Sequence, residues 1–463
     1  MFAACSTPAG ISGIAVIRVS GDGCGEAVDK IARVIRAADN CKTIADLKGY
    51  TAAYCVIEDP VTKEKIDDVV ITKFENPHSY TGEEMVEISC HGSLAVKQEI
   101  LRLLGECGIE PAGPGEFSKT AFINGKMSLD RVEAVMDVIA SDSQKALSAA
   151  ENIMSGALSD LLNKAESEIY RAMALIEMTV EFPEHDDTPE NEEEITDICV
   201  TQRDSLKDLT TRFEQGRILS ERMRVALLGL PNSGKSSLLN ALSGYERAIV
   251  TEVPGTTRDT VEVDLSVGGI PVTLIDTAGL RQSDDKVEAE GIRRASDTFK
   301  AADMAFYLVS PEMQPEEVKT QLDDLGKDTY TVVLFSKADA GENPQRDRIQ
   351  KICEEHGIEK FISVSGTENI NLDSIRNSIE ERYERAGSGS TEGLIVTNAR
   401  HRECIAQAVK YMDAATDAAR GQLGLELVSS ALRAAADEIG KITGKTVSSE
   451  LADTIFSRFC IGK

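Results

Sequence analysis

The sequence predicts a multidomain chain of mixed α/β and α class. We expect an N-terminal α+β domain, a discontinuous helical domain, and a parallel α/β domain inserted into the helical one. The 463 residues suffice for roughly three domains of ordinary size. Hydrophobic residues make up 41% of the chain, which is enough to form buried cores. Two stretches with helical periodicity flank one in which apolar strands alternate with helices, and an inserted domain is the simplest arrangement that gives this order.

Residues 1–120 alternate short β-like runs with turns. The runs at 14–19, 68–72 and 85–88 are rich in apolar and β-branched residues and predict strands. Residues 94–104 have the apolar spacing of a helix. The Pro- and Gly-rich turn at 111–115 ends this pattern. Residues 1–120 are therefore predicted to form a small α+β domain.

The periodicity changes after about residue 126. Apolar side chains then recur at the spacing of one helix face, at Leu129, Val132, Val135, Met136 and Ile139. Residues 181–197 contain nine acidic residues and no Lys or Arg, which we interpret as a solvated loop. Helical pattern resumes as far as Leu219. The first part of the helical domain is therefore expected over residues 121–219.

Residues 220–386 alternate apolar strands with helices, which predicts the inserted α/β domain. The sequence Gly-Ser-Gly-Ser-Thr at 387–391 is typical of a flexible linker. Residues 391–463 are helical in pattern and form the second part of the helical domain. They carry nine basic and nine acidic residues, so the net charge of the whole chain lies in the preceding part.

The composition limits the kinds of partner. Lys and Arg number 50 against 78 Asp and Glu, which gives a net charge of −28. This argues against a protein that binds nucleic acid or anionic membranes with its whole surface, but it leaves room for a local basic patch or a basic partner protein. The ten cysteines contain no C-x-x-C spacing, and their scatter favours reduced cytoplasmic thiols over a zinc site or disulfide framework. We expect neither a membrane span nor a signal peptide.

A phosphate-binding loop follows the first predicted strand of the inserted domain. Residues 223–228 have the pattern of a buried strand, residues 229–236 read G-x-x-x-x-G-K-S, and a helical stretch follows. In such a loop, backbone N–H groups surround phosphates at a helix N-terminus. Lys235 is expected to reach the β- and γ-phosphates, and Ser236 to bind Mg²⁺. Further GTP contacts in this loop are expected from Asn232, Ser233, Gly234 and Ser237.

Two further phosphate-side motifs follow in order. A predicted strand at 272–275 leads into Asp-Thr-Ala-Gly, in which Asp276 is expected to hold Mg²⁺ through water and the Gly279 N–H to contact the γ-phosphate. Between this motif and the first loop, Thr257 is the natural second Mg²⁺ ligand. Lys235 and Asp276 are candidate catalytic residues. These motifs predict nucleotide contacts by Thr251, Glu252, Val253, Pro254, Gly255, Thr256, Thr257, Asp276, Thr277, Ala278 and Gly279.

The base is expected to contact the segment after the predicted strand at 331–335. The carboxylate of Asp339 can accept hydrogen bonds from N1–H and the 2-amino group of guanine, and because adenine lacks this pair of donors, GTP is favoured over ATP. The stem of Lys337 can lie over the base face. A second strand-loop can present backbone N–H groups to the guanine oxygen, at Ser363, Val364 and Ser365. The usual motif is N-K-x-D, and Ser336 replaces its asparagine, which predicts a modest affinity.

The chain as a whole resembles the MnmE (TrmE) family of bacterial tRNA-modifying GTPases. The resemblance rests on Gly-Thr-Thr-Arg-Asp at 255–259, Asp-Thr-Ala-Gly-Leu-Arg at 276–281, the inserted domain, and the ending Phe-Cys-Ile-Gly-Lys at 459–463. Motifs in the N-terminal part add to it, at residues 7–8, 17–20, 79–83, 91–92, 114–118 and 121–126.

The resemblance implies a Ras-like G domain and an N-terminal folate-binding-like domain that mediates homodimerisation. Such proteins form a heterotetramer with the flavoprotein MnmG in the cytoplasm. Together the two modify the wobble uridine of certain tRNAs at ring carbon five, which gains an aminomethyl or carboxymethylaminomethyl group. A 5-formyl- or methylene-tetrahydrofolate supplies one carbon, and glycine or ammonium supplies the amine. The acidic chain fits this role, because the partner can make much of the tRNA contact.

The resemblance also implies potassium-dependent GTP hydrolysis by paired G domains. The positions that match the potassium ligands are Asn232, Thr251, Thr256 and, through its carbonyl, Val253. Potassium would take the place of an arginine finger against the charge that develops on the phosphates. Glu288 matches the family's catalytic glutamate, which orients the attacking water through a second water. Taken without the resemblance, Glu288 has the character of a helix-surface acid.

Four charged positions match the family's folate site: Arg18, Glu87, Lys126 and Lys463. The cations suit the anionic glutamate tail and the carboxylate suits the pterin ring. The alternative is that all four are ordinary surface charges. Lys463 can join the site only if the C-terminal helix packs near the N-terminal domain of this chain or of a second subunit. The ending Cys-Ile-Gly-Lys stands where a prenylation box would, but fits such a box poorly. Whether Cys460 has a chemical role stays open.

Two functions remain for the chain. One is an enzyme of tRNA modification driven by a GTPase cycle. The other is a GTPase switch or scaffold, for example in ribosome assembly, with no carbon chemistry. The nucleotide motifs fit both functions, whereas the N-terminal motifs and the C-terminal tail favour the enzyme.

Overall fold

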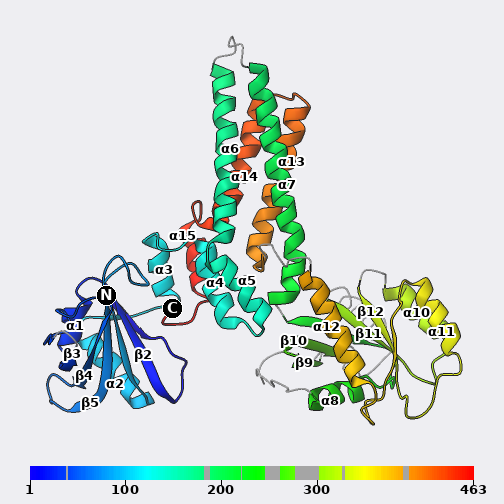
Figure 1. Ribbon diagram of the computed structural model, residues 1–463, viewed down its shortest axis with the longest axis horizontal. Helices are drawn as coiled ribbons and strands as arrows, with labels where there is room; N and C mark the ends of the chain where they lie inside the picture. Colours follow the sequence, from blue (N-terminus) through cyan, green and yellow to red (C-terminus); the bar gives the residue numbers. More distant parts are fainter. Residues whose placement is uncertain are drawn as a thin grey trace, which may run out of the picture. The chain divides into compact units, whose positions relative to one another are not determined.

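The computed structural model describes residues 1–37, 40–181, 188–220, 222–245, 261–276, 302–325, 329–388 and 396–463. The chain divides into two compact units, one of residues 1–136, 154–200 and 410–463 and one of residues 137–153 and 201–409. Figure 1 shows the elements of both units. Within the described residues, no helix combines the length and the apolar character that a membrane crossing needs.

A seven-stranded sheet with the order β3-β4-β5-β6-β2-β1-β7 dominates the N-terminal part of the first unit. Its strands are antiparallel except for the β1–β7 pair. The strands are β1 (Phe2–Cys5), β2 (Ser12–Ser20), β3 (Ala32–Ala37), β4 (Thr51–Glu58), β5 (Lys65–Phe74), β6 (Met85–Gly92) and β7 (Glu110–Pro111). The three predicted strands of this region are confirmed as parts of β2, β5 and β6.

Helices pack on both faces of this sheet, and on one face Phe117 of α3 (Glu116–Ile123) forms a buried cluster with Ala4 of β1. Helices α1 (Cys24–Asp29) and α2 (Leu94–Glu106) pack on the face that carries Ile17, Ile71 and Ile88, and together they form a buried core. Because side chains alternate along a strand, Arg18 lies on the opposite face of β2 from Ile17. The register between β2 and β6 pairs Arg18 with Glu87 on that opposite face.

Helices from both ends of the helical domain meet in the first unit. Helix α6 (Ala157–Glu181) packs against α14 (Leu425–Thr443), and the two are neighbours in Figure 1. Leu162 of α6 and Leu432 of α14 are fully buried, as the predicted apolar periodicity requires. Segments before and after the inserted domain therefore build one discontinuous helical domain. This domain also contains α4 (Leu129–Ala140), α7 (Thr188–Ser220), α13 (Ala399–Arg420) and α15 (Ser449–Phe456).

Two local predictions were wrong. The acidic run was predicted as a loop, but its residues from Thr188 onward form the start of α7. Acidic side chains stabilise a helix N-terminus, and Ile195 and Cys199 bury an apolar face of this helix. The predicted linker begins inside a helix, since α12 (Leu372–Ser388) extends through the first two of its residues. Residues 389–391 lie outside the described residues.

The second unit contains a six-stranded sheet with the order β13-β12-β11-β8-β10-β9, in which only β9 is antiparallel to its neighbour. Helices cover both faces, so the strands are continuous apolar runs. On one face α8 (Lys235–Tyr245) and α12 pack through residues such as Leu242 and Ile379. On the other, α10 (Pro315–Leu325) and α11 (Arg346–Glu355) pack through Val318 and Ile349. Helix α5 (Gln144–Met154) contributes Ala149 to the first of these cores.

The strands of this sheet are β8 (Met223–Leu228), β9 (Val261–Val267), β10 (Ile270–Asp276), β11 (Met304–Val309), β12 (Thr331–Phe335) and β13 (Phe361–Ser363). The predicted strands at 223–228, 272–275 and 331–335 are confirmed. The chain is thus an α+β domain, a discontinuous helical domain and an inserted P-loop α/β domain, as the sequence predicted.

Candidate functional site

A cavity of about 470 Å³ opens at the carboxyl ends of the parallel strands in the second unit. It brings together loops that follow β8, β12 and β13. The predicted GTP-binding residues in its wall are Asn232, Gly234, Lys235, Ser236, Ser237, Lys337, Asp339, Val364 and Ser365. Segments far apart in the sequence therefore meet where the motifs predicted a nucleotide.

The phosphate loop is held tightly against the sheet. Gly229 has φ +135°, and a Cβ there would lie 2.5 Å from the Leu308 carbonyl oxygen, so only glycine fits. Ser233 is buried. The ammonium of Lys235 lies inside the loop, where it donates hydrogen bonds to Gly229 O at 2.6 Å and Leu230 O at 2.8 Å. Lys235 is also the first residue of α8, so the positive end of the helix dipole faces the same cavity.

The base-side loop is fixed to its neighbours by backbone hydrogen bonds. The Ser336 N–H donates to Val309 O at 2.9 Å, and the Ala338 N–H donates to Val364 O at 3.1 Å. Lys337 has φ +56°, and its ammonium lies 3.4 Å from a Glu312 carboxylate oxygen. Asp339 follows in the cavity wall.

The loop that follows β13 differs in two details from what the sequence predicted. Ser363 lies in the wall of a smaller cavity and not of the large one. The N–H groups of Val364 and Ser365 donate to the carbonyls of Phe335 and Ile370, so within the chain they are already engaged.

Sequence reasoning missed several residues of the cavity wall: Leu238, Leu308, Ser336, Ala340, Gly366 and Thr367. A Cβ at Gly366 would lie 2.8 Å from the Ser237 backbone, so a glycine is needed for this loop to approach α8. The glycine directly after Ser365 was the available signal in the sequence.

Several predicted site residues cannot be placed. Thr251, Glu252, Val253, Pro254, Gly255, Thr256, Thr257, Thr277, Ala278, Gly279 and Glu288 lie outside the described residues. They include the second Mg²⁺ ligand, all the predicted potassium ligands except Asn232, and the catalytic glutamate. Asp276 is the last residue of β10, and only its backbone is described.

A second group of charges lies in the first unit, on the face of its sheet opposite α1 and α2. Arg18 Nε is 2.7 Å from Glu87 Oε1, and the Arg18 guanidinium lies 5.5 Å from the centre of the Tyr80 ring. Among the described residues, the buried Arg18 Nη1 has no hydrogen-bond partner. Burial lowers the pKa of Lys463, and the nearby Arg18 charge lowers this pKa further. Three of the four predicted folate residues therefore lie together.

Lys126 lies against the loop that carries Tyr80. Its ammonium donates to Pro77 O at 2.7 Å, and its stem contacts the loop at Gly82, where an added Cβ would lie 3.0 Å from Lys126 Cγ. The Asn124 amide donates to Thr81 O at 2.8 Å. Both ends of this loop are thus fastened to the segment that carries Lys126.

The C-terminal tail reaches the N-terminal domain of its own chain. Gly115 N–H donates to Cys460 O at 3.3 Å, and Ile461 forms an antiparallel bridge with Pro114. Gly462 has φ +92°, and a Cβ there would lie 2.6 Å from Cys5 O. The tail therefore lies directly on the backbone of β1. This satisfies, within one subunit, the condition that Lys463 needed to join Arg18 and Glu87.

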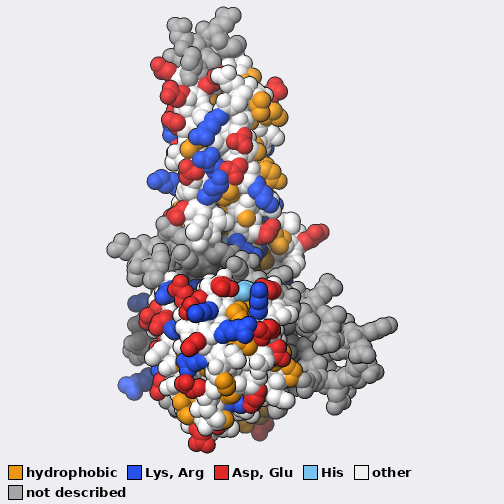
Figure 2. All heavy atoms as spheres, turned by 90° about the vertical axis from the view of Figure 1, so that its right-hand side faces the viewer, with side chains coloured by type: hydrophobic (Ala, Val, Ile, Leu, Met, Phe, Trp, Pro, Cys, Tyr) orange, Lys and Arg blue, Asp and Glu red, His pale blue; other side chains and the backbone are white. Residues whose placement is uncertain are grey.

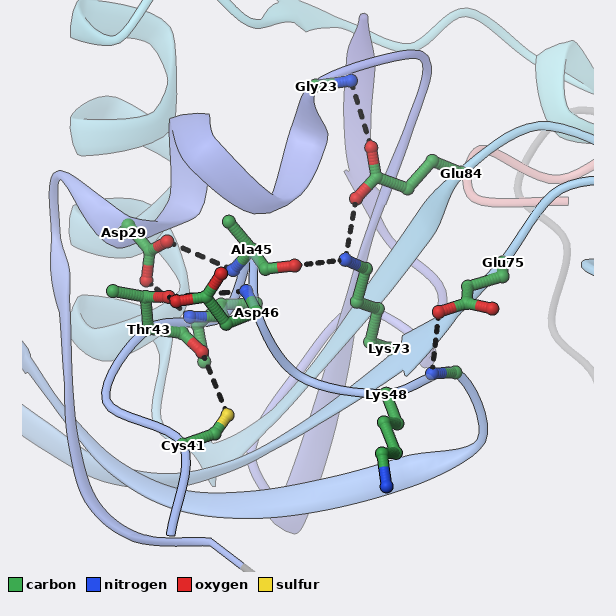
Figure 3. A network of polar contacts seen from close by, with 12 residues as sticks. Gly23, Asp29, Cys41, Thr43, Ala45, Asp46, Lys48, Lys73, Glu75 and Glu84 are labelled. Atoms are coloured by element: carbon green, nitrogen blue, oxygen red, sulfur yellow. Dashed lines mark hydrogen bonds and ion pairs between the residues drawn. The ribbon is translucent and has the colours of Figure 1, made fainter. Parts of the chain in front are cut away.

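Figure 3 shows a polar network around Lys73 and Glu84, which lie before and after the loop that carries Tyr80. Lys73 donates to Ala45 O and lies 3.3 Å from Glu84 Oε1, while Glu84 Oε2 accepts from the Gly23 N–H at 2.9 Å. The Tyr80 hydroxyl is 2.8 Å from Ser118 Oγ. Tyr80 is therefore held in place beside Arg18 by contacts on both sides of the loop.

The chain matches two family models over nearly its whole length. The model described as GTP-binding protein TrmE N-terminus matches residues 1–126, and the model described as MnmE helical domain matches residues 129–460. Among solved structures, the G domain of the T. maritima FeoB iron transporter is 22% identical, with a TM-score of 0.26, over 36% of this chain and 99% of that chain.

Curated relatives are similar along the full chain. The tRNA modification GTPase MnmE of Acetivibrio thermocellus is 36% identical over 100% of this chain and 98% of its own length. The protein of the same name from Natranaerobius thermophilus is 35% identical over 100% of this chain and 99% of its own length. Identity at this level, over both complete chains and with the nucleotide cavity in place, shows that the chain belongs to the MnmE family of tRNA modification GTPases.

Proposed function

We propose that this tRNA-modifying GTPase acts on ring carbon five of the wobble uridine and uses a one-carbon tetrahydrofolate as the carbon donor. The product group is aminomethyl or carboxymethylaminomethyl. The observation that carries this proposal is the cluster of Arg18, Glu87 and Lys463, which joins both ends of the chain on the sheet face opposite α1 and α2.

The cluster suits a folate in charge and shape. It holds two cations and one carboxylate, which matches an anionic glutamate tail and a pterin edge with several donors. The buried Arg18 Nη1 has a proton to donate, and a ligand oxygen would satisfy it. The face of the Tyr80 ring gives a flat apolar surface next to that donor. Lys126 would add a further cation at the rim. Bound tetrahydrofolate would supply the one-carbon unit that is transferred.

On the phosphate side, Lys235 and the N-terminus of α8 would stabilise the charge of the β- and γ-phosphates. Ser236 lines the cavity next to Lys235, and its hydroxyl would bind Mg²⁺ there. Thr257 and, through water, Asp276 would complete that ion's ligands. Mg²⁺ would supply positive charge that offsets the negative charge of the phosphates during hydrolysis. Asp339 would accept two hydrogen bonds from guanine.

We further propose that hydrolysis depends on potassium and on pairing of G domains. Asn232, in the cavity wall with φ +63°, would bind the ion together with Thr251, Val253 and Thr256. The ion would supply the positive charge that an arginine finger provides in other GTPases. Glu288 would orient the attacking water through a second water.

The proposed assembly is a homodimer that binds an MnmG-like flavoprotein in a heterotetramer in the cytoplasm. The charge distribution is compatible with tRNA as substrate, since residues 391–463 carry no net charge within an otherwise acidic chain. Figure 2 shows Lys and Arg side chains interspersed with Asp and Glu on the helical bundle, in the upper part of that view. The flavoprotein would supply the remaining tRNA contacts.

The experiment that tests this function is mass analysis of wobble-uridine nucleosides in tRNA from a strain that lacks the protein. We expect the modified nucleosides to disappear and the wild-type gene to restore them. Unchanged nucleosides would reject the carbon-transfer role and favour a GTPase switch in ribosome assembly.

A further inference from the structure

Ser336 occupies the position that is asparagine in the usual base-reading motif, and its hydroxyl is engaged within the protein. The residue is buried, and its hydroxyl donates to Val309 O at 3.3 Å. A hydroxyl has one proton, so this bond leaves none for the nucleotide or the phosphate loop. An added Cβ at Gly234 would lie 3.7 Å from Ser336 Cβ and 3.9 Å from Ser336 Oγ, so Ser336 packs beside the phosphate loop.

Asn343, at the other end of the same loop, has a fully engaged amide. It is buried, and its Nδ2 donates to Ser310 O at 2.9 Å and to Met313 O at 3.0 Å. Its Oδ1 accepts from the Gln345 N–H at 2.7 Å, just before α11 begins. The side chain therefore ties the base-side loop to the segment that follows β11.

The loop between Ser336 and Asn343 is thus fastened to one segment, residues 309–313, at both of its ends. Lys337 adds an ion pair with Glu312 of that same segment. Asp339 lies between these anchors and lines the nucleotide cavity. The anchor at Ser336 is a hydroxyl bond at 3.3 Å, whereas the amide at Asn343 donates two shorter bonds from a buried position.

We infer that Asn343 is the positioning residue that holds Asp339 in register with the guanine edge, in place of the amide missing at position 336. This inference rests on the proposed reading of guanine by Asp339. The strength of two parallel hydrogen bonds to a carboxylate depends steeply on their direction. If the loop shifts or loosens, the protein therefore loses its preference for guanine before it loses phosphate binding.

The test compares the binding of GDP and IDP to the full-length protein by titration calorimetry in magnesium buffer. IDP lacks the 2-amino group, so the ratio of the two dissociation constants reports how well Asp339 is engaged. One charge-assisted hydrogen bond predicts a preference for GDP of about tenfold or more in the wild type. Asn343→Ala is expected to weaken GDP binding by about tenfold and to reduce the preference to below about threefold.

Two further variants separate positioning from folding. Asn343→Asp keeps the oxygen that accepts from the Gln345 N–H but loses the two hydrogen bonds that Nδ2 donates. This variant therefore tests the positioning role if Asn343→Ala does not fold. The double variant Ser336→Asn with Asn343→Ala returns an amide to the other end of the loop. It is expected to recover, on a logarithmic scale, at least half of the lost preference for GDP over IDP. The matched control is Asn398→Ala. Asn398 accepts from the Arg400 N–H at 2.8 Å in the same way at the start of α13, outside the cavity wall.

If both Asn343 variants lower the melting temperature but keep the wild-type preference for GDP over IDP, Asn343 is only structural and the inference is overturned. An undiminished preference in a stable Asn343 variant overturns it as well. A wild-type protein that does not prefer GDP over ADP would instead reject the reading of guanine by Asp339, whatever the Asn343 variants do.

Discussion

Arg18 and Glu87 pair across neighbouring strands, with Nε and Oε1 2.7 Å apart, and the C-terminal residue Lys463 lies close enough for Arg18 to lower its pKa. The pair sits on the sheet face opposite α1 and α2. A charged group built from both ends of the chain gives a strong reason to look for an anionic ligand there.

Replacing Arg18 is expected to abolish folate binding and wobble modification while GTP hydrolysis continues. Arg18→Ala removes the guanidinium whose Nη1 is free for a ligand and leaves Glu87 unpaired. Calorimetry with 5-formyl-tetrahydrofolate and nucleoside analysis measure the two losses. Arg33→Ala is the matched control, because Arg33 pairs with Glu58 at the surface of the same sheet. If Arg18→Ala binds folate with the wild-type affinity, Arg18 is not part of the folate site.

Adding one methyl group to the tail should have a similar effect. Gly462→Ala places a Cβ 2.6 Å from Cys5 O at φ +92°, so the tail must leave β1 and carry Lys463 away from Arg18. We expect loss of modification with GTPase activity retained. Gly108→Ala controls for backbone strain alone, since Gly108 has φ +87° and an added Cβ there meets no atom within 4 Å. Equal modification by the two variants would show that the position of the tail does not matter.

The base preference should change with Asp339. Asp339→Asn replaces an acceptor by an amide that suits the second carbonyl of xanthine, so GTP binding should weaken by about a hundredfold and xanthosine triphosphate binding should improve. Competition binding with both nucleotides measures this. Asp347→Asn, an exposed carboxylate in the first turn of α11, is the control. A variant that keeps its full preference for GTP would refute the assignment.

Hydrolysis should be fast in potassium and slow in a matched sodium buffer, because Asn232 lies in the cavity wall where the proposed ion needs a ligand. Equal turnover in the two salts would rule out the potassium site.

Glu288→Ala should slow turnover by about a hundredfold with near-normal nucleotide affinity. Glu316→Ala, an acid in the first turn of α10, serves as control. A large loss of nucleotide affinity in Glu288→Ala would show that Glu288 has a structural role instead.

Thiol labelling of the native protein should modify Cys460, in the C-terminal tail, first. Burial raises the pKa of Cys24, Cys55 and Cys353 to about 12, so at pH 8 only about one in ten thousand of each is thiolate. Cys460 is exposed. We expect the fastest reaction of the native protein with a chromogenic disulfide to occur at Cys460 and to vanish in Cys460→Ser. Because thiolate is the reactive form, the buried thiols should gain reactivity only as the pH approaches 12 or the protein unfolds. A fast phase that survives in Cys460→Ser would contradict this.

The sequence by itself determined the elements and the motifs. The phosphate loop, its strand and its helix follow from glycine spacing and apolar periodicity within a dozen residues, and the predicted strands and discontinuous helical domain were confirmed for the same reason. The acidic run shows the limit of this reasoning. Its charge suggested a loop, but Ile195 and Cys199 pack in the folded chain and make the segment helical from Thr188.

Only the tertiary structure decided which distant residues meet. No local pattern could show that Lys463 joins Arg18 and Glu87 of the same chain, because that depends on how Gly462 and Ile461 lie on β1 and on residues 114–115. The direction of the Ser336 hydroxyl and the engaged amide of Asn343 were equally hidden, since each depends on carbonyls of the segment after β11. Short-range periodicity encodes local conformation, whereas a site assembled from separate segments exists only after those segments have packed together.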